Sequence, residues 1–539
     1  MPDASFDAVI VGAGHNGLCL AAYLARAGLS VGIFERRHDE GGGACTESDV
    51  TIPGFYHNLH AQYMEFMDYM PFYYDFELNK HGARIMRPEC QLGITFADGR
   101  PPIVMYAPDL LDKSCESIAR YSKHDAEVWK ELKGKVTQYD KLLAAWLYSP
   151  PPDPARGDDV GEVQRQADQT WALLGLPATY VYKCPKVIID ELFETPELRA
   201  LLYRQCVEWG SNLHDVHAGG GWGFVLSVIW FAGIHYLSIG GTHTLAHAMA
   251  NACLREGVTL RFTSPVVKVN LKNNHATGVT LKDGSVIEAR KLVASNADSR
   301  TTFIDLIGME HLSPLRRERL ANWRFGPETV LATPSFALHN PPEYKSAKHD
   351  PAINKCFYTV VGFESDEDVS NYILEAYGGA VPKTPGAGTW VNTLWDPSQA
   401  PPGKHSMNGW FFFPNASCLS EEEWDEVRTT YNDRFLELWG RYAPNMKPDN
   451  VIAHRLHVPF DIEKKIGMPE GAFSHGQPGH VEIAGAPMYW YRTEIEGFYL
   501  CGASVGHSGV SAAGGYNCFK VICDDYELPK IWQRPERAY

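Results

Sequence analysis

The sequence predicts an α/β protein in which one domain is assembled from separated segments and a second, α+β domain is inserted between them. Three observations carry this prediction. The chain opens with a strand, a glycine turn, a helix and a second strand, over residues 7–37. A strand, a glycine turn and a helix recur near the C-terminus, over residues 496–525. At 539 residues the chain is also too long for one ordinary core.

Composition and charge exclude several classes of function. Hydrophobic residues make up 45% and charged residues 21%, as in folded, soluble proteins. The net charge of -16, without a long basic run, argues against nucleic acid as a partner. Twelve cysteines occur without a C-x-x-C pair, which excludes the usual zinc and dithiol spacings and favours a reduced compartment. The N-terminus leads directly into a strand, without a signal peptide, so we expect a cytoplasmic protein.

The opening segment reads DAVIVGAGHNGLCLAAYLARAGLSVGIFERR and contains Gly12, Gly14 and Gly17 in the spacing G-x-G-x-x-G. An apolar strand precedes the glycines and a helix follows them, as in a Rossmann-like dinucleotide-binding unit. We expect Gly12 to permit the tight turn, Gly14 to let the backbone approach a pyrophosphate, and Gly17 to let helix and strand pack closely. The helix N-terminus would then face the phosphates.

The second strand of this unit ends at Glu35, whose carboxylate can accept hydrogen bonds from a ribose diol and would repel a 2′-phosphate. Arg36 and Arg37 follow it. They leave a 2′-phosphate open as an alternative, although solvated surface charges or neighbours of the pyrophosphate are the better interpretations.

Two further segments favour FAD over NAD. Gly41, Gly42 and Gly43 follow the second strand in a row, as where a backbone passes close to a ligand. Near the C-terminus, FYLCG predicts a short strand that leads through a Gly/Ser-rich turn into a helix around 516–523. The N-terminus of that helix would suit the edge of an isoalloxazine that becomes negative on reduction. Neither a second G-x-G-x-x-G on a strand nor a redox dithiol is present, so a pyridine nucleotide–disulfide reductase is not indicated.

The opening segment with GGGACT, the central segment GGTHTLAHAMANACLREG with the strands that follow it, and the C-terminal GFYLCGASVGHSGVSAAGGYN resemble the phytoene desaturase-like flavoproteins. That family includes carotenoid desaturases, carotenoid isomerases and retinol saturase, and it lies within the amine oxidase-type fold. The resemblance covers only the cofactor domain. The chain has Ala44 where relatives often have Arg. It has Ala503 where many amine oxidases have an acid, and this second difference favours the desaturase branch.

The resemblance implies residues for each part of FAD. Glu35 would bind the adenosine ribose and Val266 the adenine, while Gly42 and Gly43 would lie along the pyrophosphate and flavin. The full cofactor-binding set is Gly12, Ala13, Gly14, Asn16, Gly17, Glu35, Arg36, Gly42, Gly43, Val266, Gly502, Ala503, Val510 and Ser511.

The FAD-binding domain is expected to be discontinuous, with segments 1–70, 236–310 and 485–539. Its middle segment predicts a helix over 243–257 and strands at 258–262, 266–271, 276–281 and 291–295. Segments 71–235 and 311–484 would form the substrate-binding domain. Within it, the proline-rich stretch 148–159 predicts an exposed loop or lid edge.

Aromatic-rich stretches at 63–76, 222–231, 408–414 and 488–492 suit either a long apolar tunnel or ordinary core packing. Residues 222–239 carry no Asp, Glu, Lys or Arg. We interpret them as a buried helix or pocket wall rather than a membrane span, and peripheral membrane contact stays an alternative.

Histidines supply the candidate catalytic group. His57, His60 and His235 are expected to be structural, and His507, in the C-terminal turn, is the candidate that would face the isoalloxazine. His243 and His247 have i, i+4 spacing, but no third ligand is evident in the sequence, so no metal is predicted.

Together these features predict an FAD-dependent oxidoreductase, of the desaturase, dehydrogenase or saturase type, acting on carbon–carbon bonds of an apolar, polyene or lipid-like substrate. O₂ or a quinone would accept the electrons, and no oligomeric state is predicted. Three alternatives stay open: a redox-neutral isomerase or hydratase that requires reduced FAD, a flavin oxidase of a small polar substrate, and a non-enzymatic scaffold.

Overall fold

The computed structural model describes residues 2–153, 156–159, 161–216, 220–326, 330–476, 490–505 and 511–533. Two seven-stranded sheets organise them. The strands of the first sheet are β1 (Ala4–Val11), β2 (Val31–Phe34), β10 (Thr259–Arg261), β11 (Val266–Lys272), β12 (His275–Leu281), β13 (Val286–Ser295) and β19 (Phe498–Leu500). Their order is β10-β2-β1-β13-β12-β11, and β19 pairs with the C-terminal half of β13.

The first sheet is parallel from β10 through β2, β1 and β13 to β19, and β11 and β12 add an antiparallel hairpin. Three helices pack beside it: α1 (His15–Arg26), α10 (His243–Arg255) and α15 (Ala513–Tyr526). The small residues of α1, Ala21 and Ala22, are fully buried, which lets α1 lie against both other helices. Strands from three separated segments thus share one sheet, and the Rossmann-like α/β prediction is confirmed.

The second sheet is built from the inserted segments. Its strands are β7 (Cys90–Ile94), β8 (Ile103–Tyr106), β14 (Leu331–Leu338), β15 (Tyr358–Val361), β16 (Ala387–Trp390), β17 (His405–Phe412) and β18 (Val451–His457). Their order is β18-β14-β17-β16-β15-β7-β8. All neighbours are antiparallel except β7 and β15, so the two inserted segments meet at a parallel pair.

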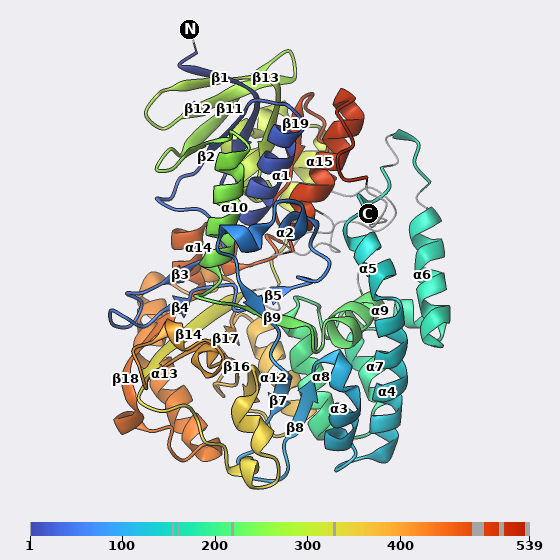
Figure 1. Cartoon of the computed structure of the whole chain (residues 1–539), viewed down its shortest axis with the longest axis vertical. Helices are drawn as coiled ribbons and strands as arrows, with labels where there is room; N and C mark the ends of the chain where they lie inside the picture. The colour runs from blue at the N-terminus through green and yellow to red at the C-terminus, as the bar shows by residue number, and fades with distance from the viewer. Residues whose placement is uncertain are drawn as a thin grey trace.

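Most of the other helices lie around the second sheet. The full set is α2 (Pro71–Asp75), α3 (Leu111–Ile118), α4 (Lys123–Gln138), α5 (Asp140–Leu147), α6 (Gly161–Leu174), α7 (Pro185–Leu192), α8 (Pro196–Glu208), α9 (Gly220–Gly223), α11 (Pro314–Ala321), α12 (Asp366–Tyr377), α13 (Glu421–Tyr442) and α14 (Pro459–Ile466), with π-helices at Phe224–Trp230 and Thr301–Ile307. The second π-helix instead packs against β11 of the first sheet, and α2 packs against α1. Figure 1 shows α3 to α8 along one side of the lower half and α13 on the opposite side, beside β18.

Short strands and a shared core connect the two halves. The short strands are β3 (Thr46–Glu47), β4 (His57–Asn58), β5 (Met64–Glu65), β6 (Ile85–Met86) and β9 (His235–Ser238), and β9 pairs with both β5 and β6. One hydrophobic cluster extends from Val9 in the first sheet to Trp390 in the second. A separate cluster lies between the second sheet and α13, around Phe411 and Trp439.

Two sequence predictions require correction. Residues 222–239 are largely buried, as predicted, but they do not form one helix: a π-helix ends at Trp230 and the chain then forms β9, because β5 and β6 provide edges for pairing. Among the described residues of the stretch 148–159, those at 156–159 are exposed, whereas Tyr148 and Asp153 are buried against α15 and its neighbours. Within the described parts of the chain, no helix combines the length and the apolar sequence needed to cross a membrane.

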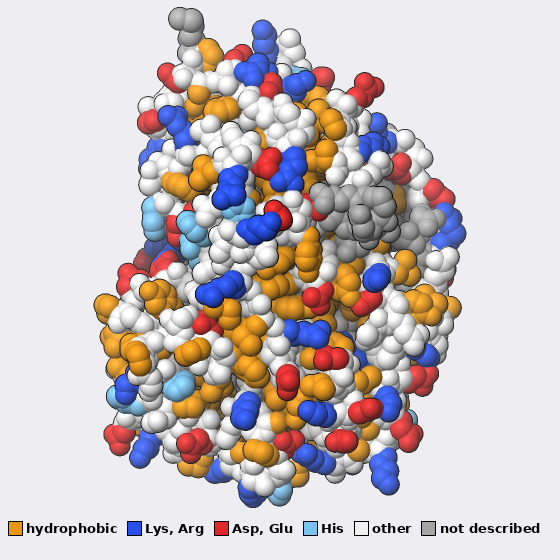
Figure 2. All heavy atoms as spheres, in the orientation of Figure 1, with side chains coloured by type: hydrophobic (Ala, Val, Ile, Leu, Met, Phe, Trp, Pro, Cys, Tyr) orange, Lys and Arg blue, Asp and Glu red, His pale blue; other side chains and the backbone are white. Residues whose placement is uncertain are grey.

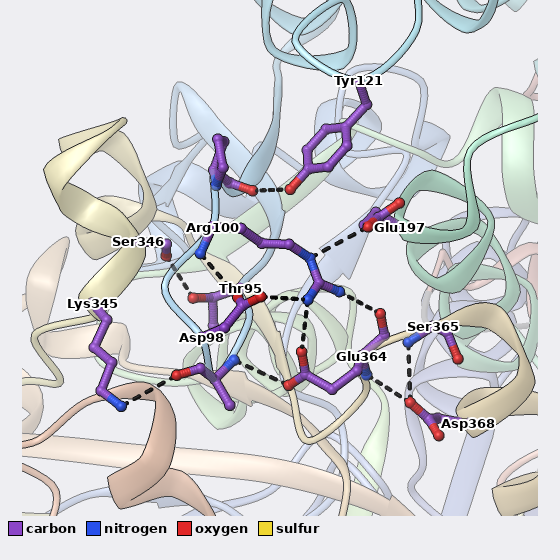
Figure 3. A network of polar contacts seen from close by, with 12 residues as sticks. Thr95, Asp98, Arg100, Tyr121, Glu197, Lys345, Ser346, Glu364, Ser365 and Asp368 are labelled. Carbon is purple, nitrogen blue, oxygen red and sulfur yellow. Dashed lines mark hydrogen bonds and ion pairs between the residues drawn. The ribbon is translucent and has the colours of Figure 1, made fainter.

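A polar network fastens the far end of the second sheet (Figure 3). Arg100, in the β7–β8 turn, donates to the carboxylate of Glu364 at 3.2 Å and to its carbonyl at 2.6 Å, and its Nε lies 3.3 Å from a carboxylate oxygen of Glu197 in α8. Its guanidinium also lies 4.0 Å above the centre of the Phe96 ring. These contacts join the two inserted segments, and we assign them a structural role.

Candidate functional site

The glycine turn between β1 and α1 depends on close backbone approach. Gly12 has φ of +92°, which side-chain-bearing residues rarely adopt. A Cβ on Gly17 would lie 2.5 Å from the Gly12 carbonyl oxygen, so this glycine lets helix and strand pack closely, as predicted. A Cβ on Gly14 would lie 2.4 Å from Nδ2 of Asn296, a protein neighbour that sequence reasoning did not anticipate.

Two helix N-termini lie together at this turn. Gly14 caps α1 and Ala512 caps α15, and neither helix has a capping side chain or an acid in its first turn. The buried Asn16 joins them, because its Oδ1 accepts a hydrogen bond from the Gly515 amide at 3.2 Å. The N-termini of two helices, each with its partial positive charge, therefore converge on one region, which suits an anionic ligand.

Glu35 anchors the turn from the end of β2. Its side chain is buried, and its two carboxylate oxygens each accept an amide hydrogen bond of 2.8 Å, one from Ala13 and one from Arg37. The Glu35 carbonyl accepts from the amide of Ser264, two residues before Val266. The structure therefore brings the predicted ribose and adenine residues to one edge of the sheet.

The glycine triplet runs along the same turn. The Gly41 amide donates to the Ala13 carbonyl at 2.9 Å, and a Cβ on Gly42 would lie 3.4 Å from the Cα of Gly14. Gly43 points the other way: its carbonyl accepts from Ala61 at 3.0 Å, and a Cβ there would lie 3.2 Å from Nδ1 of His60. The triplet thus leads from the α1 turn toward His60. Arg36, by contrast, is exposed and lies against Gly467.

The turn after β19 completes the region. The backbone of Gly502 lies close to that of Asn296, since a Cβ on Gly502 would lie 2.6 Å from the Asn296 carbonyl oxygen. Ala503 follows it and is half-buried. Ser511 is buried, its hydroxyl has no hydrogen-bond partner among the described residues, and its carbonyl accepts from the Tyr148 hydroxyl at 3.2 Å. His507 and Val510 lie outside the described residues.

Asn296 is the residue that connects both glycine turns, and sequence reasoning missed it. It directly follows β13, and its amide donates to the Val11 carbonyl at 2.9 Å. The sequence did offer one signal for Asn296: it directly follows a predicted strand. In parallel sheets, ligands bind at the carboxyl ends of the strands.

An aromatic cluster begins where the glycine triplet ends. We use this name for Tyr63, Trp209, His235, Tyr358, Trp390 and Trp410. Tyr63 lies at its centre, with ring centroids at 4.4 Å from His235, 5.4 Å from Trp209, 5.7 Å from Trp390 and 5.8 Å from Trp410. Residues from stretches 63–76 and 408–414 therefore meet, as either interpretation of the aromatic-rich stretches requires.

The cluster is attached to the glycine triplet through His60. The Trp410 indole N–H donates to the His60 carbonyl at 2.9 Å, and Phe473 stacks on Trp410 at 6.2 Å between ring centroids. Burial lowers the pKa of His60 to about 3, with smaller contributions from His475 and His15. His60 is therefore neutral at physiological pH.

A buried ion pair supports the cluster from α8. Arg204 Nη2 lies 3.4 Å from Glu208 Oε2 and donates to the Trp410 carbonyl at 2.8 Å. Glu208 Oε2 also accepts from the Tyr358 hydroxyl at 2.8 Å. Burial raises the pKa of Glu208 although Arg204 opposes this shift. Sequence reasoning missed this pair, whose only signal was two opposite charges at i, i+4 in the second half of α8.

The remaining histidines have other partners. Both ring nitrogens of His57 are hydrogen-bonded, to Thr51 and Asn408 at 2.9 Å each, so His57 is structural as predicted. His235 belongs to the aromatic cluster, and burial, followed by the nearby Lys133, lowers its pKa to about 3. His243 and His247 lie on α10, away from the cluster.

Comparison with known proteins shows which family the chain is similar to. Residues 10–76 match the NAD(P)-binding Rossmann-like domain. The chain is 31% identical to a limonene dehydrogenase polypeptide of Castellaniella defragrans, over 99% of this chain and 97% of that protein. It is 24% identical to the lycopene-forming phytoene desaturase of Paracoccus sp., over 95% of each chain. It is also 24% identical to prolycopene isomerase 1 of an Oncidium hybrid cultivar, over 97% of this chain and 85% of that protein.

Solved structures share the fold. An oxidoreductase from Methanosarcina mazei superposes with a TM-score of 0.61 at 15% identity, covering 96% of this chain and 99% of that one. A putrescine oxidase double mutant superposes with a TM-score of 0.56 at 13% identity, covering 97% and 99% of the two chains. The sequence relationship extends over nearly the whole chain, well beyond the cofactor-domain segments that carried the resemblance. The chain belongs to the phytoene desaturase-like family of FAD-dependent oxidoreductases, with the amine oxidase-type fold, and it is an enzyme of that class.

Proposed function

We propose that this enzyme binds FAD and acts as a dehydrogenase or desaturase on carbon–carbon bonds of an apolar, terpenoid hydrocarbon. The observation that carries the proposal is the direct connection between the glycine triplet and the aromatic cluster: Gly43 contacts Ala61 and His60, and His60 contacts Trp410. The names of the relatives agree with this substrate class, since two act on limonene and phytoene.

The described residues fit FAD. Glu35 and Val266 would hold the adenosine, the uncapped N-terminus of α1 with Gly42 the pyrophosphate, and Gly43, Gly502 and Ser511 the flavin. Within the same proposal, the FAD-binding domain comprises segments 1–70, 236–310 and 485–539, and the other two segments bind substrate. His507 and Val510 keep their proposed places in the C-terminal turn.

When bound, the isoalloxazine supplies the acceptor for a hydride from one substrate carbon, while the adjacent carbon loses a proton to form the double bond. The aromatic cluster would bury the hydrocarbon and exclude water from the reacting carbons. Arg204 and Glu208 position Trp410 and Tyr358 rather than contact substrate. With a pKa lowered to about 3, His60 would be a weak base, and the proton would pass to water or to the C-terminal turn.

Oxidation requires a second substrate to receive the electrons, and we propose O₂ or a quinone, the latter reached by peripheral contact with a membrane. A redox-neutral isomerase that requires reduced FAD is the second candidate, favoured by the similarity to a prolycopene isomerase. It would use the same cofactor residues.

An anaerobic titration tests the proposal. Purified protein with bound flavin should absorb near ~370 and ~450 nm, and limonene or phytoene should bleach the ~450 nm band stoichiometrically, since oxidation of substrate reduces the flavin. Conversion only with pre-reduced flavin that stays reduced would establish the isomerase instead. Protein that binds no FAD would contradict the cofactor assignment.

A matched pair of variants tests the aromatic cluster. Trp410→Phe and Trp424→Phe each remove one indole N–H bond of 2.9 Å to a buried carbonyl, of His60 and Ala416 respectively. Both should lower the unfolding free energy by about 1–3 kcal/mol. Only Trp410→Phe should also lower kcat/KM, because Trp424 lies in the cluster beside α13. If the two variants lower kcat/KM equally, the aromatic cluster does not form part of the substrate site.

A further inference from the structure

The structure brings a carboxylate to the two histidines for which the sequence shows no third ligand. Glu40, in the loop after β2, directs one oxygen, Oε1, between two imidazoles of α10: it lies 3.0 Å from Nδ1 of His247 and 3.5 Å from Nε2 of His243. All three ligand atoms lie within 4.8 Å of one another. The side chain of Glu40 is buried, whereas that of His247 is 63% exposed. Figure 2 shows histidine side chains on the flank where Figure 1 places α10.

We propose that Glu40, His243 and His247 form a binding site for one divalent transition-metal ion, of which Zn²⁺ is the best match. Two imidazole nitrogens and one carboxylate oxygen are ligands that Zn²⁺ takes at about 2.0–2.2 Å in tetrahedral geometry, which places ligand atoms about 3.3 Å apart. The two distances to Glu40 bracket that value. A water molecule would complete the coordination, since the His247 side opens to solvent.

The rest of the loop supports a preformed site. Gly41, next to Glu40, lies against α10, because a Cβ there would be 2.8 Å from the Cβ of Ala246. The amide of His243 donates to the Thr46 hydroxyl at 3.1 Å. The loop and the first turn of α10 are therefore held together without a metal, and the ligands need little rearrangement to bind one. The ion would link α10 to the loop that precedes the glycine triplet. This metal site is separate from the site of the redox reaction.

The test uses untagged, full-length protein, freed of metal with a chelator and titrated with Zn²⁺ alone in a calorimeter. Wild type should bind one equivalent, and His247→Ala and Glu40→Gln should each weaken binding at least about tenfold. His311→Ala is the matched control: it removes an exposed histidine whose Nε2 lies 3.6 Å from a carboxylate oxygen of Glu310, a pair outside any three-ligand cluster of the described residues. It should bind like wild type.

Two further readouts separate a built site from general histidine binding. Co²⁺ should give the visible absorption of a tetrahedral complex in wild type and His311→Ala, but not in His247→Ala. Zn²⁺ should raise the melting temperature of the same two proteins only, because it binds the folded state. Circular dichroism of the metal-free variants checks that each is folded. Equal Zn²⁺ stoichiometry and affinity in all four proteins would overturn the proposal and leave Glu40 as a hydrogen-bond acceptor for the histidines.

Discussion

At the scale of a single residue, Glu35 shapes the glycine turn and is also the residue that we propose for the ribose of FAD. Its carboxylate binds the amides of Ala13 and Arg37, and these hydrogen bonds shape the loop on both sides of it. A carboxylate has further lone pairs that stay available to a ribose diol. The residue therefore organises the turn before any ligand arrives, which reduces the ordering that a ligand must drive.

The change Glu35→Gln tests this double role. An amide keeps one acceptor but presents an NH₂ group to the second backbone amide, so one buried donor loses its partner. We expect the unfolding free energy to fall by about 1–3 kcal/mol and FAD affinity to fall roughly tenfold or more. Urea denaturation and fluorescence titration with FAD measure the two effects. Glu310→Gln, at an exposed position, should change neither.

Two helical glycines should respond to the same substitution with opposite signs. In Gly17→Ala, the new Cβ meets the Gly12 carbonyl oxygen at 2.5 Å, so we expect a loss of about 1–3 kcal/mol of stability. In Gly134→Ala, in α4, nothing lies within 4 Å of the new Cβ, and helix propensity should raise stability by about 0.5–1 kcal/mol. Thermal unfolding compares them. A stable Gly17→Ala variant would refute the close packing of α1 on β1.

At the scale of elements, a buried lysine ends the π-helix. Lys133, in α4, donates to the carbonyls of Ile229 at 2.8 Å and Trp230 at 2.9 Å, and also to that of Ala232. The first two carbonyls belong to the last turn of the π-helix and the third follows it, where the chain leaves helical geometry to form β9. Lys133 thus satisfies the carbonyls that the break in residues 222–239 would otherwise leave unpaired.

Lys133 should impose a pH dependence on stability. Burial lowers its pKa from 10.5 to about 7, so between these values the unfolded chain holds a proton that the folded protein lacks. The contribution of Lys133 to stability therefore rises with pH through this window, by no more than about 1.4 kcal/mol per pH unit, and is least favourable below pH 7. Urea denaturation from pH 7 to 10 should show this slope in wild type but not in Lys133→Met.

Lys130→Met is the control for this experiment. Lys130 lies on the same helix but is exposed and pairs with Asp112 at 2.7 Å. Its removal should leave the slope of the wild type unchanged. If Lys133→Met keeps that slope too, the ammonium of Lys133 titrates normally in the folded protein.

At the scale of the whole molecule, the two halves share one core. The hydrophobic cluster that contains Val9 also contains Trp390 and Trp410. The C-terminal helix adds polar contacts: Lys520 donates to the Tyr148 carbonyl at 2.8 Å, and Arg492 pairs with both Asp525 and Asp153. The chain also passes between the halves several times, so we expect them to unfold together.

Tryptophan fluorescence can test this coupling. Of the fourteen tryptophans, only Trp490 and Trp532 belong to the three segments of the proposed FAD-binding domain. The fluorescence transition therefore reports mainly on the other half. FAD at one hundred times its Kd should raise the unfolding free energy by about 2.7 kcal/mol, and the tryptophan transition should move with it. Riboflavin at equal absorbance controls for optical filtering. An unmoved tryptophan transition beside a shifted release of flavin would show that the halves unfold independently.

The sequence by itself determined the Rossmann-like unit, the discontinuity of its sheet and the family. These rest on local patterns: the glycine spacing, Glu35 at the end of a strand, and a second strand–turn–helix near the C-terminus. Each follows from contacts over a few residues, which chain geometry specifies without knowledge of the rest of the fold. The assignment of individual residues to FAD stays a prediction.

The tertiary structure decided which distant residues meet. Asn296 reaches both glycine turns, Glu40 lies between His243 and His247, and Trp410 reaches His60 across the two halves. No periodicity encodes these contacts, because they depend on how strands and helices from remote segments are ordered. The same reason explains why the sequence left residues 222–239 open between a buried helix and a pocket wall. Their apolar sequence suits burial in either form, and only the edges of β5 and β6 selected a strand for the second part.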